Sequence, residues 1–453
     1  MAKYQKYAEY QDSGVEWLEQ VPKNWEIIKI KHLSSVKRGA SPRPIDDPKY
    51  FDDNGEYAWV RIADVSASDT YLLNTTQTMS DLGSSLSVKL EPNELFLSIA
   101  GTVGKPCINK IKACIHDGFV YFPDLKIPNK FLFYVFAGEQ AYKGLGKMGT
   151  QLNLNTDTVG DIKVALPKSI EDIQNIINFL DHETAQIDTL IAKQEKLIEL
   201  LKEKRQAVIS HAVTKGLNPD VAMKDSGVEW LGKVPEHWVV AQLKFNMLDI
   251  QTGPFGSQLH AEDYIEDGIP LINPAHMING VLVPDTQITV DQVTQERLSR
   301  HKLAVGDIIF ARRGELGRCA IVRDENVGWL CGTGSLKAKL NDNLIPDYAY
   351  LLITSDGLVA ELSLESKGST MDNLNTETLG KVRTPVPPIE EQTAILNYVE
   401  QASGKYKKLI ENAESAIQLM QERRTALISS AVTGKIDVRN WQHPNEAKTG
   451  LSL

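Results

Sequence analysis

Two long stretches without proline, roughly residues 171–213 and 390–432, carry hydrophobic positions spaced three and four apart. In the first stretch these positions are Ile187, Leu190, Gln194, Leu197, Leu201, Lys204 and Val208. In the second stretch, offset by 219 residues, they are Tyr406, Leu409, Ala413, Ala416, Met420, Arg423 and Leu427. Because this spacing is the a/d pattern of a coiled-coil seam, we predict two long helices.

The two helices fit each other better than they fit copies of themselves. Leu197 aligns with Ala416 and Gln194 with Ala413, so a bulkier position meets a smaller one. A whole domain separates the helices in sequence, which makes an antiparallel pair natural. Each helix would be about 60 Å long at about 1.5 Å per residue, long enough to act as a spacer. A solvated amphipathic helix or a simple homodimer stays the alternative.

The regions before each helix show a different pattern. Short β-like runs broken by Gly, Pro and Asn occur at Tyr57–Val65, Glu94–Ile99, Leu271–Asn273 and Asp307–Ala311. We therefore predict an α/β (α+β) fold class, with two bodies in tandem that are separated and joined by two long antiparallel coiled-coil helices.

The chain also contains a pseudo-twofold internal repeat, because the same short motifs occur in the same order in both halves. Asp12–Leu18 and Asp225–Leu231 both read DSGVEWL, VPKNW at 21–25 returns as VPEHW at 234–238, and NLNT at 153–156 returns at 373–376. The interiors between these landmarks differ widely. We predict a first body at 1–168, a central helix at 169–216, a second body at 217–388, a distal helix at 389–436 and a tail at 437–453.

Charge and cysteine usage narrow the class of protein. The net charge is −10, and residues 217–388 alone contribute −8, whereas residues 1–168 are neutral. Any DNA binding must therefore depend on local basic clusters or on a partner. The four cysteines form no Cys-x-x-Cys pair, so we expect reduced thiols without a metal, and the lack of a signal peptide or an 18-residue apolar run predicts a cytoplasmic location.

Catalytic motifs are missing from the sequence. There is no Asn-Pro-Pro-Tyr or Asp-Pro-Pro-Tyr motif, no His-Glu-x-x-His, and the segment Gly101–Lys105 lacks the spacing of a P-loop. The acid-x-Lys pattern at Asp161–Lys163, preceded by Asp124, is common by chance and has no counterpart in the second half. We predict a protein that is not an enzyme and needs no cofactor or metal.

A second internal match lies inside the bodies. Leu90–Ser98 followed by Gly101–Lys105 aligns with Leu303–Ala311 followed by Gly314–Arg318 at an offset of 213. Both read as a strand, a Gly-x-x-Gly turn and a cation, a combination that lets backbone and charge approach a phosphate. The alternative is a β-hairpin turn with an incidental cation.

If the chain binds DNA, basic and amide-rich loops are the other candidates for contact, because arginine pairs with guanine and Asn or Gln with adenine. They lie at 37–43, 252–258, 147–155 and 367–375, and turn or cap chemistry is the alternative for the last two. Trp25 and Trp238 are expected in the core rather than as stacking platforms. The candidate DNA-contacting residues are Lys37, Arg38, Ser41, Arg43, Lys105, Lys147, Thr150, Gln151, Asn153, Ser257, Gln258, Arg312, Arg313, Arg318, Lys367, Ser369, Thr370 and Asn373.

Together these features resemble the specificity subunit of type I restriction-modification systems. The resemblance rests on DSGVEWL with VPxxW at the start of both halves, the LNT segments, and the helix ends RQAVIS at 205–210 and RTALIS at 424–429. GPFGSQL at 253–259 also looks like a family motif at the start of a target-recognition domain. The resemblance covers essentially the whole chain.

The resemblance implies a non-catalytic subunit with two target-recognition domains. Each domain would read one half of a split sequence in double-stranded DNA. The helices would set the spacing and dock two methyltransferase (modification) subunits, and motor-nuclease (restriction) subunits would join for cleavage. A helical scaffold or adaptor that reads no DNA stays the alternative, and the acidic second body favours it.

Overall fold

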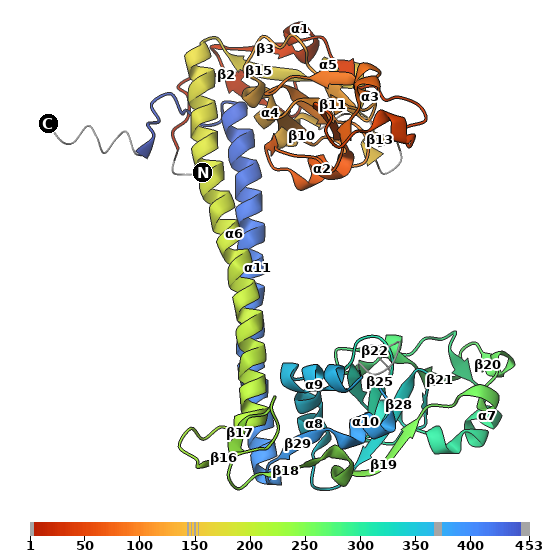
Figure 1. The fold of residues 1–453 in the computed structure, drawn as a ribbon. Coiled ribbons are helices and arrows are strands. Elements are labelled where there is room, and N and C mark those ends of the chain that lie inside the picture. The colour runs from red at the N-terminus through yellow and green to blue at the C-terminus, as the bar shows by residue number, and fades with distance from the viewer. Residues whose placement is uncertain are drawn as a thin grey trace. The chain divides into compact units, whose positions relative to one another are not determined.

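The computed structural model describes residues 4–142, 145, 147, 148, 151, 152, 154–366 and 374–444. The chain divides into two compact units (Figure 1): unit 1 comprises residues 1–195 and 415–453, and unit 2 comprises residues 196–414. Each unit contains one body and a part of both long helices, and the two are described separately below.

Both predicted long helices are present. They are α6 (Ile170–Lys215) and α11 (Ile389–Val432), within a few residues of the predicted ranges. Gly216 and Gly434 follow their ends with φ of +77° and +71°, the left-handed conformation in which glycine most readily stops a helix.

The helices run antiparallel within each unit. In unit 1 the beginning of α6, with Ile176, shares a hydrophobic core with the end of α11, with Ile428, and Asp188 pairs with Arg424 at 2.8 Å. In unit 2 the end of α6, with Val213, shares a core with the beginning of α11, with Ile395. The antiparallel prediction is confirmed.

The predicted seam was wrong at several positions. Leu190 and Leu197 are 50% and 42% exposed, and Lys204, Leu409 and Arg423 are also exposed. Each of the two leucines is followed by an isoleucine, Ile191 or Ile198, that is half-buried instead. Ile187 is buried, and Gln194, Leu201 and Val208 are half-buried, so every second predicted position of α6 is correct and the inward stripe passes through Ile191 and Ile198 between them.

The body of unit 1 is built from two sheets and a short β pair. Strand β3 (Trp25–Lys29) pairs antiparallel with β15 (Lys163–Pro167), which closes the body just before α6. The larger sheet has the order β4 (Lys37–Arg38), β12 (Phe119–Tyr121), β9 (Leu95–Ser98), β10 (Pro106–Asn109), β6 (Tyr71–Leu72). The smaller sheet has the order β7 (Thr78–Met79), β5 (Tyr57–Val60), β11 (Ala113–Ile115), β8 (Val88–Leu90).

Short helices connect and cover these strands in unit 1. They are α1 (Ile30–Leu33), α2 (Ile62–Ala67), α3 (Asp81–Ser85), α4 (Asn129–Ala137) and α5 (Thr156–Asp161). The predicted strand over 57–65 ends at Val60, because the Asp64 carboxylate accepts the backbone N–H of Arg61 and starts α2 there. The predicted strand over 94–99 corresponds to β9.

Unit 2 repeats this plan. Strand β18 (Val239–Gln242) pairs antiparallel with β29 (Arg383–Val386). One sheet has the order β19 (Met247–Thr252), β28 (Ser335–Leu340), β25 (Ile308–Ala311), β26 (Cys319–Ile321). The other has the order β20 (Tyr264–Ile265), β24 (Thr289–Val290), β21 (Ile269–Ile272), β27 (Leu330–Cys331). The helices are α7 (Gln292–Arg297), α8 (Pro346–Ile353), α9 (Asp356–Ser366) and α10 (Thr376–Lys381).

The repeated DSGVEWL motif forms the same turn in both units. It joins hairpin strands β1 (Tyr10–Asp12) and β2 (Gln20–Pro22) in unit 1, and β16 (Met223–Asp225) and β17 (Lys233–Pro235) in unit 2. Asp12 accepts the backbone N–H of Gly14 at 2.9 Å, and Asp225 accepts that of Gly227 at 2.8 Å. The turn needs its glycine because φ is positive there.

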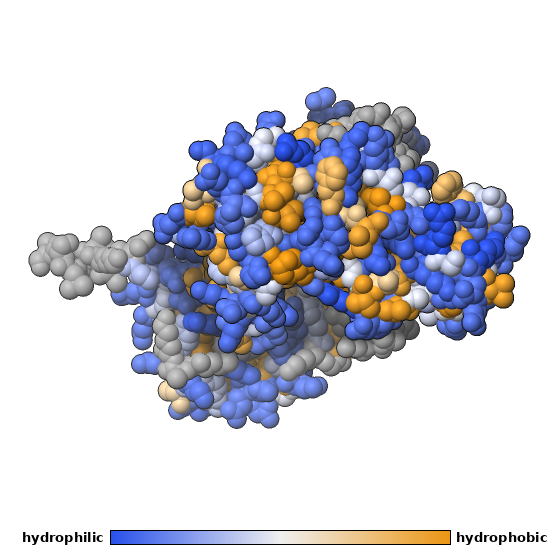
Figure 2. Space-filling model, turned by 90° about the horizontal axis from the view of Figure 1, so that it is seen from below, coloured by the Kyte–Doolittle hydropathy of each residue, from blue (hydrophilic) through white to orange (hydrophobic). Residues whose placement is uncertain are grey.

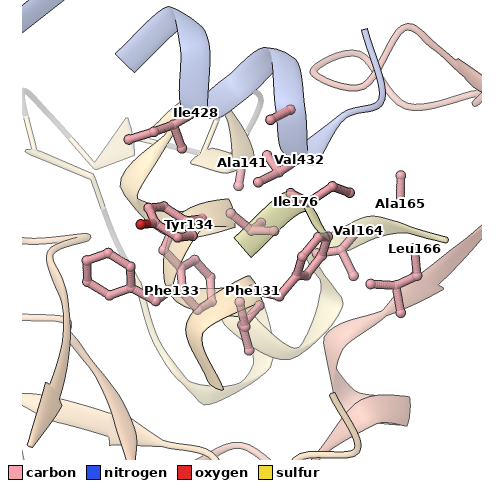
Figure 3. Packing of buried hydrophobic residues seen from close by; sticks show 14 of the residues in the cluster. Phe131, Phe133, Tyr134, Ala141, Val164, Ala165, Leu166, Ile176, Ile428 and Val432 are labelled. Carbon is pink, nitrogen blue, oxygen red and sulfur yellow. The ribbon is translucent and has the colours of Figure 1, made fainter. Parts of the chain in front are cut away.

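The core of unit 1 ties its body to the helices. Phe131 and Tyr134 of α4 lie between Val164 of β15, Ile176 of α6 and Ile428 of α11 (Figure 3). Burying one such aromatic or aliphatic side chain contributes about 1.5–3 kcal/mol, so this cluster fixes the body on the helix pair.

The tryptophans of the VPxxW motifs also belong to the cores. Trp25 is 2% exposed and Trp238 fully buried, which confirms the core prediction for both. All four cysteines are buried and unpaired. On the face drawn in Figure 2, hydrophobic side chains form separate groups among hydrophilic ones. No helix among the described residues has the length and apolarity to cross a bilayer.

Candidate nucleic-acid interface

One end of the larger sheet in unit 1 carries two basic candidates of the first body, Arg38 and Lys105. Arg38 at the end of β4 lies opposite Val120, and Phe119 at the start of β12 lies opposite Ser98 at the end of β9. The backbone N–H of Ser98 in turn donates to the carbonyl of Lys105, just before β10. We call this end of the sheet, where these strands begin or terminate, sheet end 1.

Asp117 accepts the hydrogen bonds that hold the basic loop after β4. Arg38 donates to the backbone carbonyl of Asp117 at 2.5 Å, Ser41 to its carboxylate at 3.4 Å, and Arg43 to the same carboxylate at 3.1 Å. Lys37 is exposed beside them. One aspartate therefore orients three donors, and the loop keeps a net positive charge.

Gly39 lets this loop lie close to the neighbouring turn. A Cβ at this position would overlap the carbonyl oxygen of His116. Burial lowers the pKa of His116, against the opposing effect of Asp117, so the ring favours its neutral form and accepts the backbone N–H of Gly118 at 2.9 Å. The loop and the turn thus brace each other.

The corresponding end of the sheet in unit 2, which we call sheet end 2, is also held by a close backbone contact at a glycine. Thr252 at the end of β19 pairs with Leu336, and the next residue, Gly253, donates its N–H to Ser335 at 2.9 Å. A Cβ on Gly253 would overlap the carbonyl of Gly332. Ser257 and Gln258 are exposed in the loop that follows.

The three candidate arginines of the second body lie at this end of the sheet. The backbone N–H of Arg312 donates to Gly334 at 2.9 Å, and Arg313 is exposed beside it. Arg318 directly precedes β26, its carbonyl accepts the N–H of Ala311, and its guanidinium binds Glu315 at 2.6 Å. Part of the positive charge at sheet end 2 is therefore already neutralised.

The Gly-x-x-Gly segments are the turns of two β-hairpins, β9–β10 and β25–β26. Lys105 donates to the backbone carbonyl of Ser66 at 2.8 Å and lines a cavity of about 840 Å³ that α6 and α11 also line, together with Asp69 and Glu195. The cations of both turns thus have protein partners, and their contact with DNA stays a prediction.

Several candidates cannot be placed. Thr150, Asn153, Lys367, Ser369, Thr370 and Asn373 lie outside the described residues, as do the side chains of Lys147 and Gln151. Leu374 directly follows the second of these loops, and its N–H donates to Arg312 at 2.8 Å, so the loop ends at sheet end 2.

The second asparagine of each NLNT segment has cap chemistry. Asn155 accepts the backbone N–H of Thr158 at 2.9 Å at the start of α5, and Asn375 accepts that of Thr378 at 2.8 Å at the start of α10. Both side chains satisfy helix ends, which agrees with the alternative stated for these two residues.

Residues that brace the loops were missed from sequence. Gly39 and Gly253 align at an offset of 214, and this coincidence was the available signal, but Asp117 had none because its partners are far away in the chain. Among the described residues no three metal-ligating side chains come together.

Comparison with known proteins agrees with this architecture. A family model described as the type I restriction modification DNA specificity domain matches residues 22–200 and 235–418, well over half of the chain. The EcoBI specificity subunit of Escherichia coli is 25% identical over 303 residues, 65% of this chain and 63% of that protein. The MjaVIII specificity subunit of Methanocaldococcus jannaschii is 23% identical over 432 residues, 93% of this chain and 95% of that protein.

Solved structures share the fold. A chain from a study of the assembly and conformational transition of the type I R-M system superposes with a TM-score of 0.65 at 14% identity, covering 91% of this chain and 98% of that one. The HsdS subunit of Thermoanaerobacter tengcongensis gives 0.52 at 14% identity, covering 92% and 98%. The chain therefore belongs to the type I restriction-modification specificity subunits and carries their DNA specificity domain twice.

Proposed function

We propose that this subunit reads a split sequence in double-stranded DNA, with sheet end 1 on one half-site and sheet end 2 on the other. The recognition bodies are residues 1–168 and 217–388. The subunit contributes no catalytic group and requires no cofactor, and it acts in the cytoplasm.

One observation carries this proposal: the two bodies share their frame but differ at the corresponding sheet ends. In unit 1, Arg38 binds the backbone carbonyl of Asp117, Arg43 binds its carboxylate, and Lys37 is exposed, whereas unit 2 presents amide and hydroxyl groups beside Arg312 and Arg313. Two domains that read different sequences each need cations that bind the DNA backbone. They also need polar groups that differ between the domains and contact the bases.

The long helices supply the second part of the proposal. A helix of 46 residues is about 69 Å long at about 1.5 Å per residue. We propose that α6 and α11 fix the gap between the half-sites and bind two methyltransferase subunits, and that motor-nuclease subunits join this complex. Exposed leucines such as Leu190, Leu197 and Leu419 support a protein contact on the helices.

The test is to co-express the chain with its methyltransferase subunit and to map methylated adenines across the host genome. A split motif with a fixed gap is the expected result. Random or absent methylation by a stable, active complex contradicts DNA reading and favours a scaffold or adaptor.

Two variants assign the parts. Replacing residues 38–150 by those of a relative should change one half of the motif only, and a change in both halves contradicts independent reading. Inserting matched heptads into α6 and α11 should lengthen the gap and leave both half-sites unchanged. An unchanged gap contradicts the role of the helices as a spacer.

A further inference from the structure

The loop after β19 exposes an aromatic ring. Phe255 is 61% exposed, and it stands between Gly253 and Gly256 in a loop whose next residues, Ser257 and Gln258, are polar. A single exposed apolar side chain is common and by itself indicates nothing. The location of Phe255 at sheet end 2 and the bracing of its loop are what distinguish it.

The loop holds the ring outward on a braced backbone. Gly253 lies against the carbonyl of Gly332 and donates to Ser335, and Gly256 has a φ of +59°. The side chain of Gln258 accepts the backbone N–H of Phe255 at 3.3 Å. A braced loop loses little conformational freedom on binding, so an exposed ring on it can contribute nearly all of its contact energy.

Two arginines, Arg312 and Arg313, lie at the same end of the sheet as this loop. The strand that follows Gly332 carries Gly334 and Ser335, which bind the backbone of Arg312 and Gly253 respectively, so the arginine pair and the aromatic loop share one edge. Arg313 is exposed there. Cations contact phosphates, and the groups between such contacts reach the bases.

The two units differ at this position. With the offset of 214 that aligns Gly39 and Gly253, Phe255 corresponds to Ser41, and the nearby cation Arg43 corresponds to Ser257. Sheet end 1 therefore presents a hydroxyl with a guanidinium, and sheet end 2 an aromatic ring. An apolar base contact at this position is available to unit 2 alone.

We propose that the ring of Phe255 makes an apolar contact with a base in the half-site read by unit 2. This inference rests on the proposed function. The chemistry is shared by two arrangements, the ring packed on a thymine methyl group or the ring stacked on a base face, since both are used by aromatic side chains.

The experiment compares the wild type with Phe255→Ala, Phe255→Trp and Phe245→Ala, each purified with the methyltransferase subunit. Phe245 is a matched control, because it is 65% exposed and lies at the opposite end of β19. The probes are a duplex carrying the split motif found by methylation mapping and a duplex with the unit 2 half-site scrambled. A third probe replaces thymine by deoxyuridine in that half-site.

We expect Phe255→Ala to weaken binding to the motif by about 5- to 140-fold, the range for loss of an aromatic contact with a base. Binding to the scrambled duplex and the salt dependence should not change, because no phosphate contact is lost. Phe255→Trp should recover most of the affinity, and Phe245→Ala should match the wild type.

The deoxyuridine probe separates the two arrangements. If it weakens the wild type as much as Phe255→Ala does, with no further loss in the variant, the contact is with a methyl group. If it binds the wild type normally while Phe255→Ala stays weak, the ring stacks on a base.

Two results overturn the inference while leaving the proposed function intact. One is wild-type affinity and selectivity of Phe255→Ala. The other is an equal loss on both duplexes with a changed salt slope, which shows that the loop only positions the arginines. A wild-type complex that does not distinguish the motif from the scrambled duplex contradicts the proposed function itself.

Discussion

Trp238 donates its indole N–H to the Glu391 carboxylate at 2.9 Å, joining the VPxxW motif of the second body to the first turn of α11. The corresponding pair in unit 1 is Trp25 and Asp172, at offsets of 213 and 219. The indole N–H of Trp25 is buried with no hydrogen-bond partner among the described residues. At the position of Glu391, unit 1 carries an aspartate, which is one methylene shorter than the glutamate.

Shortening Glu391 should therefore destabilise unit 2. We expect Glu391→Asp to lower the free energy of unfolding by about 1–3 kcal/mol, the cost of leaving a buried donor unpaired. Urea denaturation followed by tryptophan fluorescence measures this. Glu390→Asp, at the exposed neighbouring position, is the control, and equal midpoints for the two variants contradict the prediction.

The reciprocal change should stabilise unit 1. In Asp172→Glu the longer side chain can reach the unpaired N–H of Trp25, for an expected gain of about 1 kcal/mol. Burial raises the pKa of Asp172, and Arg439 opposes that shift, so Arg439 offsets part of the cost of a carboxylate at this position. A calorimetric Tm equal to or below that of the wild type would show that the glutamate does not reach the indole.

These two pairs show what sequence could and could not predict. The repeat located both tryptophans and both helix starts, and burial followed from their apolar surroundings. Trp238 has an acceptor in Glu391 and the indole N–H of Trp25 has none among the described residues, a difference that no sequence pattern records. The inward stripe of α6 was similarly undetermined, because Leu190 and Ile191 are both apolar and only packing selects between them.

The candidate interface likewise contains some residues that the sequence identified and others that it did not. Charge and loop composition identified Arg38, Arg43 and Arg313, and the structure places them at corresponding ends of two sheets. The elements that brace those loops, Asp117 and Gly253, act through partners distant in sequence. Composition gives no sign of such contacts.

Gly404 is a weak point in α11. It lies inside the helix, and a Cβ there would meet open space. Glycine costs about 1 kcal/mol relative to alanine in a helix interior, so Gly404→Ala should raise stability by about that amount.

Gly434→Ala is the control for this substitution. Its φ is +71° and its Cβ would meet Pro22 and Trp25, so we expect a loss of stability instead. Thermal unfolding by circular dichroism compares the two variants. A lower Tm for Gly404→Ala contradicts the argument from helix propensity.

His301 should make unit 2 sensitive to acid. Burial lowers its pKa below the ordinary value of 6.5, and Lys337 and Arg300 lower it further. Below about pH 6.5 the unfolded chain takes up a proton that the folded chain resists. The stability from neutral His301 is therefore complete above that pH and is lost as the pH falls.

His301→Gln should flatten this dependence. We expect the difference in unfolding free energy between about pH 7.5 and about pH 5.5 to be smaller in this variant than in the wild type, since these values bracket the ordinary histidine pKa. His260→Gln, which replaces an exposed histidine of the same unit, should leave this pH dependence unchanged. The same pH dependence in all three proteins contradicts the assignment to His301.

Arg313 and Arg318 should contribute differently to DNA binding. Arg313 is exposed and forms no ion pair with another described residue, whereas Arg318 is bound to Glu315 at 2.6 Å. A free cation that neutralises one phosphate releases about one counterion, but a cation already paired must first give up its carboxylate. Arg313→Ala should therefore reduce the slope of log affinity against log salt by about 1, and Arg318→Ala by clearly less.

Fluorescence anisotropy on the mapped motif between low and moderate salt measures both slopes. If Arg318→Ala produces the larger change, the Arg318–Glu315 pair opens on DNA and the hairpin turn of unit 2, rather than the end of β25, lies on the phosphates.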